Sequence, residues 1–354
     1  MASKSYLWPG VPLALGSAIL FGASAPLSKL LIGSVDPWLL AGILYLGAGI
    51  GLAIVHIGRP LIGLPSPEAS LQRGDLPWLA AVILFGGMLG PLFLMLGLSQ
   101  TSASSGSLLL NLEGLATMAI AWIVFRENVD RQLILGAGAI LAGAVLLSWT
   151  GTGLSLDTGS LFIAAACLCW GIDNNLTRKL SSADPVQIAM IKGLVAGSTN
   201  LVLALSLGAS LPGVGLIGAG AVVGFLGVGV SLVMFMLGLR HLGTARTGAY
   251  FSLAPFVGAV LAIAIFRDGI TWQLVGAGIL MAIGLYLHLA ERHDHEHDHE
   301  ALEHDHAHTH DQHHQHAHDG AVTEPHSHWH RHEPMRHKHP HYPDLHHRHG
   351  HSHG

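Results

Sequence analysis

Charged residues are scarce in this sequence. Only 11% of the 354 residues are Asp, Glu, Lys or Arg, whereas 50% are hydrophobic. A soluble globular protein carries about 25% charged residues, so this chain lacks the polar surface that it would need in water. The scarcity of charge therefore excludes a water-soluble globular protein and indicates a chain that is embedded in a lipid bilayer.

Cysteines and catalytic motifs are also few. Cys167 and Cys169 are the two cysteines of the chain. In a helix they would face different directions, so we expect no disulfide between them. The apolar runs contain neither a His-Glu-x-x-His nor a Gly-x-x-x-x-Gly-Lys motif, which argues against a membrane metalloprotease and an ATP-driven pump. We therefore expect no enzyme, no required cofactor and no nucleic-acid partner.

Long apolar runs are what the chain has in abundance. A helix that crosses a bilayer needs about 20 mostly apolar residues, and ten runs meet that need. The first run is too long for the apolar part of a signal peptide, so it should stay as a helix. The predicted fold class is an all-α integral membrane protein of ten transmembrane helices. The ten runs are residues 10–32, 37–57, 76–98, 103–125, 133–151, 158–178, 185–207, 213–239, 243–266 and 271–290.

Lysine and arginine are distributed unevenly between the loops that join these runs. If the N-terminus is cytoplasmic, the basic residues of the loops face inward except Arg267, with Lys29 near the outer end of the first helix. Such a bias is typical of cytoplasmic loops. An even number of helices returns the C-terminus to the same side. We therefore predict a multi-pass protein of the cytoplasmic membrane with both termini in the cytoplasm.

The two halves of the apolar region repeat each other. Met95-Leu-Gly-Leu98 recurs as Met236-Leu-Gly-Leu239, and Phe125-Arg-Glu127 recurs as Phe266-Arg-Asp268, in both cases after 141 residues. Each half has five predicted helices, and an odd number makes the second half enter the membrane in the opposite sense. This inverted repeat is an architecture that many secondary transporters use. The predicted domains are residues 10–151, 158–290 and, as a disordered tail, 291–354.

These repeats resemble the EamA-type group of the drug/metabolite transporter superfamily. The resemblance rests on the Phe-Arg-acid turns, on Ser252-Leu-Ala-Pro255 in the ninth run and on the Gly-rich fifth and tenth runs. It covers about residues 10–290 and implies a ten-helix carrier that moves a small metabolite across the cytoplasmic membrane, often outward. The sequence departs from the pattern at Gly114, which stands opposite Pro255, and the tail is not part of the pattern.

Ionisable residues inside the apolar runs are the candidate functional site, because a charge within a bilayer costs roughly 2.5–3.5 kcal/mol on insertion scales. Glu113 lies near the middle of the fourth run, close to Asn111, and its counterpart in the second half is Ala254. The acid is thus not a requirement of the scaffold in both halves. We predict that Glu113 and Asn111 line the transport pathway, with Glu113 binding a proton or a cation. The alternative is a structural partner for a buried base.

The seventh and ninth runs supply further candidates. Lys192 could pair with Glu113, or its side chain could extend to the inner membrane surface. Asn200 lies further along the same run and could line the same path. Tyr250 faces the position of Glu113 in the repeat and could donate a hydrogen bond to substrate, although a helical tyrosine is more often a packing residue.

A dense polar turn closes the sixth run. It contains Asp173 and Asn174, and it aligns with the stretch from Ser24 to Lys29 in the first run. Polar residues at the same place in both halves indicate that the first and sixth helices form two walls of one pathway. Asp173, Asn174 and Lys29 are therefore predicted to line it. The alternative is that the inner end of the sixth helix enters the lipid headgroups.

The tail differs from the rest of the chain in composition. Residues 291–354 hold 24 of the 27 histidines and 12 of the 22 acidic residues. Neutral imidazole binds Ni, Zn and Co, and a flexible chain can gather ligands in many registers. We therefore predict several exchangeable metal sites in a tail with too few apolar residues to fold alone. The predicted ligands are His293, His295, His297, His299, His304, His306, His308 and His310.

Two functions remain in competition at this point. The first is a secondary transporter, an exporter of a small metabolite, with proton coupling as one option. The second is a transporter of a transition metal such as Ni, Co or Zn, whose tail binds or senses the ion. The expected partners are the lipid bilayer, a small-molecule substrate and metal ions at the tail, and a homodimer is compatible with the sequence.

Overall fold

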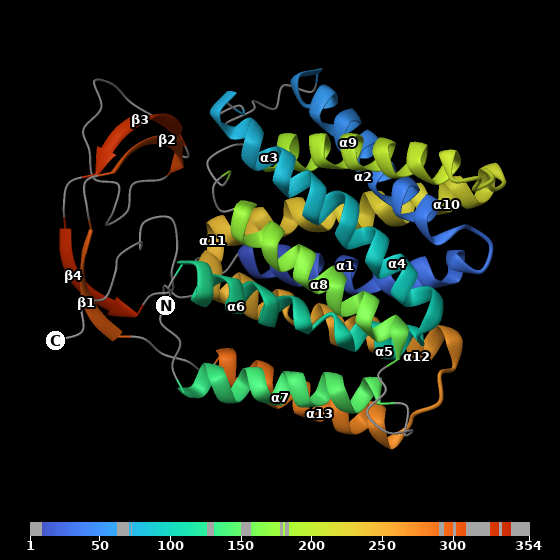
Figure 1. Ribbon diagram of the computed structural model, residues 1–354. Coiled ribbons are helices and arrows are strands. Elements are labelled where there is room, and N and C mark those ends of the chain that lie inside the picture. Colours follow the sequence, from blue (N-terminus) through green and yellow to red (C-terminus); the bar gives the residue numbers. More distant parts are fainter. Residues whose placement is uncertain are drawn as a thin grey trace.

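The computed structural model describes an α-helical bundle and four short strands in the tail (Figure 1). It describes residues 9–61, 71, 73–125, 131–149, 157–177, 180, 184–289, 294–299, 302–308, 326–332 and 335–340, the last four ranges by their backbone alone.

The first half of the chain forms helices over the predicted runs. These elements are α1 (Gly10–Ile32), α2 (Pro37–Leu61), η1 (Arg73–Asp75), α3 (Leu76–Val82), the π-helix η2 (Ile83–Leu89), α4 (Gly90–Gln100), α5 (Ala103–Leu109), α6 (Leu112–Phe125) and α7 (Arg131–Ser148).

The second half follows the same plan. Its elements are α8 (Thr158–Thr177), α9 (Pro185–Ser206), α10 (Val214–Gly224), the π-helix η4 (Phe225–Val230), α11 (Ser231–Phe251), α12 (Ala254–Phe266) and α13 (Trp272–Leu289).

Not all of these helices have the length and apolarity of a membrane span. Among the described residues seven helical segments do, and α12 and α13 are apolar but shorter. The remaining predicted run is α8, which carries the polar turn with Asp173 and Asn174. The number of ten spans therefore stays a prediction. The seven segments are Gly10–Ile32, Pro37–Arg59, Arg73–Gln100, Ala103–Val124, Arg131–Ser148, Pro185–Ser206 and Val214–Gly238.

One predicted boundary is wrong. The sequence suggested a break between residues 239 and 243, whereas α11 continues to Phe251 and the break falls at Ser252 and Leu253. Pro255 in the first turn of α12 explains the position, because proline has no backbone N–H to donate to the preceding turn. The first half breaks at the matching place, between α5 and α6, where Asn111 Nδ2 donates to the Leu108 carbonyl at 2.8 Å.

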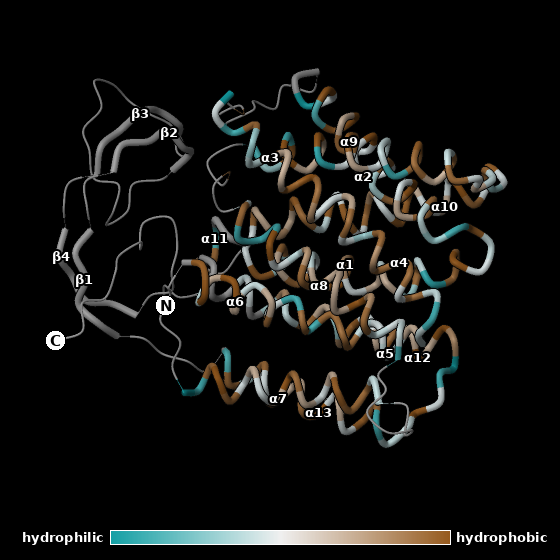
Figure 2. Tube along the Cα trace, in the orientation of Figure 1, coloured by the Kyte–Doolittle hydropathy of each residue, from teal (hydrophilic) through white to brown (hydrophobic). Residues whose placement is uncertain are grey.

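The outer surface of the bundle is apolar, as lipid contact requires. Ile54, Ile123 and Val214 are 68%, 71% and 85% exposed. Figure 2 shows hydrophobic residues along the length of the helices, with many hydrophilic residues near their ends. Such a surface would be a liability in water, and it agrees with a protein that crosses the membrane several times.

The helices of the two halves pack against one another in a reciprocal pattern. α1 lies against α11 and α12, whereas α8 lies against α4 and α6. α2 pairs with α9, and α7 pairs with α13 (Figure 1). The α2–α9 contact depends on glycine, because a Cβ at Gly193 would come within 2.6 Å of the backbone nitrogen of Gly49. Close packing through glycine is a common way to join helices in lipid.

The tail contains strands where disorder was predicted. β1 (Asp294–His299) pairs antiparallel with β4 (Met335–Pro340), and β2 (Leu302–His308) pairs antiparallel with β3 (His326–His332). The strict alternation of histidine with other residues has the two-residue period of a strand, which is the physical reason for the difference.

Candidate functional site

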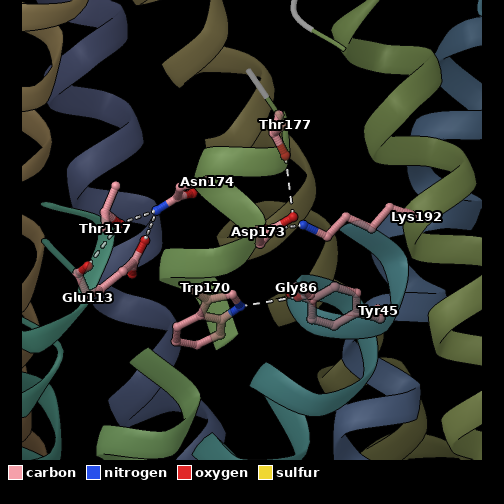
Figure 3. Close-up of polar contacts among 9 residues, drawn as sticks. All are labelled: Tyr45, Gly86, Glu113, Thr117, Trp170, Asp173, Asn174, Thr177 and Lys192. Atoms are coloured by element: carbon pink, nitrogen blue, oxygen red, sulfur yellow. Dashed lines mark hydrogen bonds and ion pairs between the residues drawn. The ribbon is translucent and has the colours of Figure 1, made fainter. Parts of the chain in front are cut away.

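Consecutive polar residues of α8 reach toward two different helices. Asp173 points to Lys192 of α9, whereas Asn174 points to Glu113 and Thr117 of α6 (Figure 3). Neighbouring positions on an α-helix are about 100° apart, so one turn can serve two partners. Gly171, one turn earlier, allows the close approach of α6, because a Cβ there would lie 2.8 Å from Ala116 Cβ.

Asp173 and Lys192 form a buried ion pair. Lys192 Nζ lies 2.5 Å from Asp173 Oδ2, and the two residues are 7% and 6% exposed. Thr177 Oγ1 donates to Asp173 Oδ1 at 3.3 Å. Removing one partner of such a pair leaves an uncompensated charge and is strongly unfavourable. The sequence left open a pair of Lys192 with Glu113 or an extension to the inner membrane surface, and the structure instead pairs Lys192 with Asp173.

Glu113 is held by an amide instead of a cation. Asn174 Nδ2 donates to Glu113 Oε1 at 3.0 Å and to Thr117 Oγ1 at 3.2 Å. Thr117 Oγ1 in turn donates to the Glu113 backbone carbonyl at 2.9 Å. Among the described residues, no lysine, arginine or histidine forms an ion pair with Glu113. Its carboxyl can therefore gain or lose a proton without breaking a salt bridge.

The π-helix η2 supplies the floor of this site. The Gly86 carbonyl accepts hydrogen bonds from Tyr45 Oη at 2.8 Å and from Trp170 Nε1 at 3.1 Å. A Cβ at Gly86 would overlap the Asp173 carboxylate and would lie 2.5 Å from Lys192 Nζ. π-Helical turns often occur at functional sites. Asn200 belongs to the same region, since its Nδ2 lies 3.5 Å from the Gly87 carbonyl and 3.4 Å from the Met88 carbonyl.

An aromatic cluster reaches the site through Trp170, which donates to the Gly86 carbonyl. The rings of Phe21 on α1 and Trp170 on α8 meet edge to face with centroids 6.2 Å apart. Phe251 lies 5.2 Å from Phe21 and 4.7 Å from Phe235. In Figure 3 the Trp170 indole lies between Glu113 and Gly86. The site thus combines one closed ion pair, one carboxyl that pairs with no cation of the described residues, and a cluster of aromatic rings.

Three predicted pathway residues lie elsewhere in the bundle. Lys29 Nζ donates to the carbonyls of Leu98 and Thr101, so it caps the C-terminal end of α4. Asn111 lies in the break between α5 and α6 and contacts Met281 Sδ at 3.8 Å. Tyr250 is half-buried near the end of α11, and among the described side chains none hydrogen-bonds its hydroxyl. Lys29 and Asn111 thus contribute to helix ends, and Tyr250 does not belong to the network around Glu113.

The predicted metal ligands fall partly within the tail strands. His295, His297 and His299 belong to β1, and His304, His306 and His308 belong to β2. His293 and His310 lie outside the described residues. The strand register sets histidine opposite histidine, for example His297 opposite His337. Among the side chains that the structure describes, no group of three or more His, Cys, Asp or Glu residues could hold a metal ion.

Comparison with known proteins assigns the helical bundle to a protein family. Residues 8–149 and residues 157–290 each match the EamA-like transporter family. The chain belongs to the EamA-like transporter family. As an EamA-family member it is a multi-pass membrane protein that carries a small-molecule substrate, which agrees with the prediction of a transporter and not of an enzyme. The His-rich tail lies outside both matched ranges.

Individual EamA relatives and one solved structure agree with this assignment. An uncharacterized transporter of Methanothermobacter thermautotrophicus is 28% identical, over 79% of this chain and 86% of its own. A protein of Salmonella typhimurium named as a probable amino-acid metabolite efflux pump is 25% identical, over 78% of this chain and 93% of its own. A crystal structure that is 18% identical has a TM-score of 0.58 and covers 79% of this chain and 95% of its own. That last likeness shows the fold alone.

Four residues of this candidate site were missed by the sequence analysis. Tyr45, Gly86 and Trp170 lie inside apolar runs and look like ordinary packing residues, and Thr117 is one of many small residues. Gly86 did leave a signal, because Gly227 follows it after the repeat interval of 141 residues and lies in the second π-helix, η4.

Proposed function

We propose that this EamA-family transporter exports a small metabolite across the cytoplasmic membrane in exchange for protons, and that Glu113 is the group that carries the proton. The observation that carries the proposal is the environment of Glu113. Its carboxyl lies in a membrane helix, accepts a hydrogen bond from an amide at 3.0 Å and has no ion-pair partner among the described residues. A carboxyl in such a place is a default candidate for proton transfer in transporters.

The internal repeat supports a functional role for this acid. Ala254 occupies the position of Glu113 in the second half and begins α12 just as Glu113 lies in the first turn of α6. The same helical break therefore forms without a carboxyl. A costly group that the scaffold does not need is best explained by transport chemistry.

The proposed mechanism is alternating access between two inverted halves of five spans each. It is supported by the reciprocal packing of α1 and α8 against the opposite halves. Two irregularities also recur after 141 or 142 residues, namely the π-helices η2 and η4 and the breaks that precede α6 and α12. Pairs of interrupted helices in matching positions are typical of transporters with inverted repeats. The proposed topology places both termini in the cytoplasm.

Export of a metabolite is the proposed direction and cargo. The support is the name of the Salmonella typhimurium relative, a probable amino-acid metabolite efflux pump. Amino acids and their derivatives are therefore the first substrates to test.

The test uses the full chain reconstituted in vesicles that contain a pH-sensitive dye. A panel of amino acids and amino-acid amides is added, and substrate-induced proton movement is recorded. We expect movement with at least one compound in the wild type and none with Glu113→Gln at equal insertion, because a glutamine side chain cannot exchange a proton. Glu113→Asp keeps a carboxyl and should keep a slower response. Wild-type proton movement in Glu113→Gln would rule out the proposed role.

Transport of a transition metal is the second candidate, and the strand register of the tail favours it. In the β2–β3 pair, His304, His306 and His308 stand opposite His330, His328 and His326. Directly opposite positions in an antiparallel pair have Cβ atoms about 4.5–5.5 Å apart, which suits imidazole ligands of one metal ion. We propose metal binding by the tail as an accessory property. A metal pathway would need ligands along the bundle, and the described helices offer few besides Glu113 and Asp173.

A further inference from the structure

The two halves of the bundle offer an internal control for the charges near Glu113. The alignment of Gly171–Arg178 with Gly22–Lys29 sets Asp173 opposite Ser24. Pro185 starts α9 and Pro37 starts α2, and seven positions further on stand Lys192 and Leu44. The ion pair of the second half thus has a neutral counterpart in the first half.

The neutral counterpart has the same geometry. A Cβ at Gly227 of η4 would lie 2.6 Å from Ser24 Cβ, just as a Cβ at Gly86 of η2 would meet Asp173. The fold therefore builds this junction without any charge when the residue over the glycine is serine. Asp173 and Lys192 are an addition to the scaffold, and they lie beside the group that we assign to the proton.

We propose that the site accepts a solute with one positive charge, an organic ammonium ion, in exchange for one proton, and that Lys192 sets this one-for-one ratio. The inference rests on the proposed role of Glu113 and deepens it by naming the class of substrate. Lys192 acts as a tethered cation that stays on Asp173 and so removes one of the two carboxylates from the exchange.

The charge count of the cluster leads to this ratio. With Glu113 ionised, the two carboxylates and the one ammonium leave a net charge of minus one. Two other titratable side chains of the described residues face the cluster, and both are neutral. They are Tyr45, whose hydroxyl donates a hydrogen bond to the Gly86 carbonyl, and Cys167, whose Sγ lies 3.7 Å from the Leu109 carbonyl. An uncompensated charge is unfavourable in a bilayer, so the empty site holds one proton and the loaded site holds one cation.

The aromatic cluster suits the same ligand. Phe21 and Trp170 are equivalent residues of the two halves, one position before Gly22 and Gly171, and their rings are in contact. They bring aromatic rings from both halves together, and Trp170 joins them to the site through its hydrogen bond to the Gly86 carbonyl. Ammonium groups are attracted to the faces of aromatic rings, most strongly to tryptophan.

The exchange balances in charge and in protons. On the cytoplasmic side the ammonium ion displaces the proton of Glu113, which leaves to water. On the outer side a proton returns to the Glu113 carboxylate as the ammonium ion leaves. Lys192 remains on Asp173 throughout, no net charge crosses the membrane and the turnover rate is independent of the membrane potential.

The first experiment compares ligands that differ in charge and share one ring. Phenylalanine amide, phenylalanine and 3-phenylpropionate are titrated into the purified full-length protein by calorimetry, in buffers of different ionisation heat that count released protons. We expect the amide to bind about tenfold or more tighter than the other two, with one proton released per bound molecule. The inference is overturned if phenylalanine binds as tightly as its amide, or if the amide does not bind.

The second experiment tests Lys192 itself. Lys192→Met leaves Asp173 without its cation, so the empty site should hold two protons. We therefore expect this variant to bind lysine amide, which has two ammonium groups, and to release two protons per bound molecule. The double variant Asp173→Ser with Lys192→Leu copies Ser24 and Leu44, and it should fold, keep the ratio of one and reject lysine amide. A folded Lys192→Met that does not bind lysine amide, or that releases only one proton per bound lysine amide, contradicts the inference. If Lys192→Met does not fold, loss of amide binding in the double variant contradicts it.

These outcomes separate the inference from the proposed function. A preference for the amide with unchanged proton release in Glu113→Gln would contradict Glu113 as the proton carrier and leave the charge class of the substrate intact. Loss of proton release in Glu113→Gln together with equal binding of phenylalanine and its amide would support Glu113 as the proton carrier and contradict the charge class of the substrate.

Discussion

The Asp173 carboxylate occupies the space directly over Gly86 that a side chain at that position would fill. The geometry ties the ion pair of α8 and α9 to the π-helix of the third predicted span. Tyr45 and Trp170 hold the Gly86 carbonyl from the other side. The position of the ion pair, and through Asn174 the position of Glu113, thus depends on one glycine.

The first prediction is that Gly86→Ala impairs transport more than it impairs the fold. The added methyl group meets the ends of two flexible side chains and not a backbone, so the Asp173–Lys192 pair moves while the helices stay in place. Overpacking of this kind costs about 1–3 kcal/mol. We expect proton-coupled flux to fall to background and the apparent melting temperature in detergent to fall only moderately.

Two other glycines calibrate that measurement. Gly138 on α7 has nothing within 4 Å of the position of a Cβ, so Gly138→Ala should leave flux and stability unchanged or slightly improved. A Cβ at Gly197 would lie 2.6 Å from Leu46 Cα, so Gly197→Ala should separate α2 from α9 and destabilise the protein more than Gly86→Ala does. Normal flux in Gly86→Ala would show that the ion pair tolerates displacement and would contradict the account.

The second prediction concerns acid stability at the start of α8. Asp157 Oδ2 accepts hydrogen bonds from Thr101 Oγ1 at 2.5 Å and from the Ser160 backbone N–H at 2.9 Å. Burial by itself raises the pKa of Asp157, but the hydrogen bonds from Thr101 and Ser160 outweigh it and hold the pKa below its usual value. A carboxyl with a lowered pKa in the folded state stabilises the protein above its unfolded pKa of about 3.9, and this contribution is lost as the pH falls through the folded value.

Variants of Asp157 separate its charge from its capping role. Asp157→Ala removes the acceptor and should destabilise α8 by about 0.5–2 kcal/mol at neutral pH. Asp157→Asn keeps an acceptor and should flatten the acid limb in melting curves recorded from about pH 3 to pH 7. An acid limb in Asp157→Asn as steep as that of the wild type would contradict this explanation.

The third prediction concerns the tail. Two-stranded ribbons are at best marginally stable in water without further packing, and the helices satisfy their own backbone in lipid. Deletion of residues 291–354 should therefore leave folding, insertion and flux of an organic substrate intact. It should abolish most binding of Ni or Zn, which in the full chain should weaken below about pH 6 as imidazoles take up protons.

The informative comparison is flux with and without metal in the truncated and full-length proteins. Unchanged organic flux in both supports an accessory tail. If a metal ion is the only solute that is transported, and truncation reduces its flux, the metal-transport function replaces the metabolite function.

The sequence predicted the helices better than it predicted the contacts of the site. Spacing and apolarity located the runs that became α1, α2 and α9 to within a few residues, because in lipid a long apolar run has few alternatives to a helix. The continuation of α11 to Phe251 was missed because the local sequence around Gly243 resembles a loop. The break between α11 and α12 is set by Pro255, which has no backbone N–H to donate to the preceding turn.

The partners of the polar residues could not be predicted in the same way. Glu113, Asp173 and Lys192 were recognised because a charge in an apolar run stands out, but which of them pair depends on the rotation and crossing of α6, α8 and α9. Lys29 was assigned to the pathway for the same reason, and the sequence did not predict that it caps the end of α4. The importance of Gly86 comes from a π-helical turn that apolar periodicity does not reveal, and its signal in the sequence is the repeat at Gly227.

The most direct test of the account follows the proton on Glu113 itself. Infrared difference spectra of the reconstituted protein are recorded before and after addition of phenylalanine amide, for the wild type and for Glu113→Gln. We expect the wild type to lose the band of a protonated carboxyl when the amide binds, and Glu113→Gln to show no such loss, because the ammonium ion replaces the proton on this one group. A wild-type carboxyl band that is unchanged by bound amide, or an equal loss in Glu113→Gln, would contradict the claim that substrate and proton exchange at Glu113.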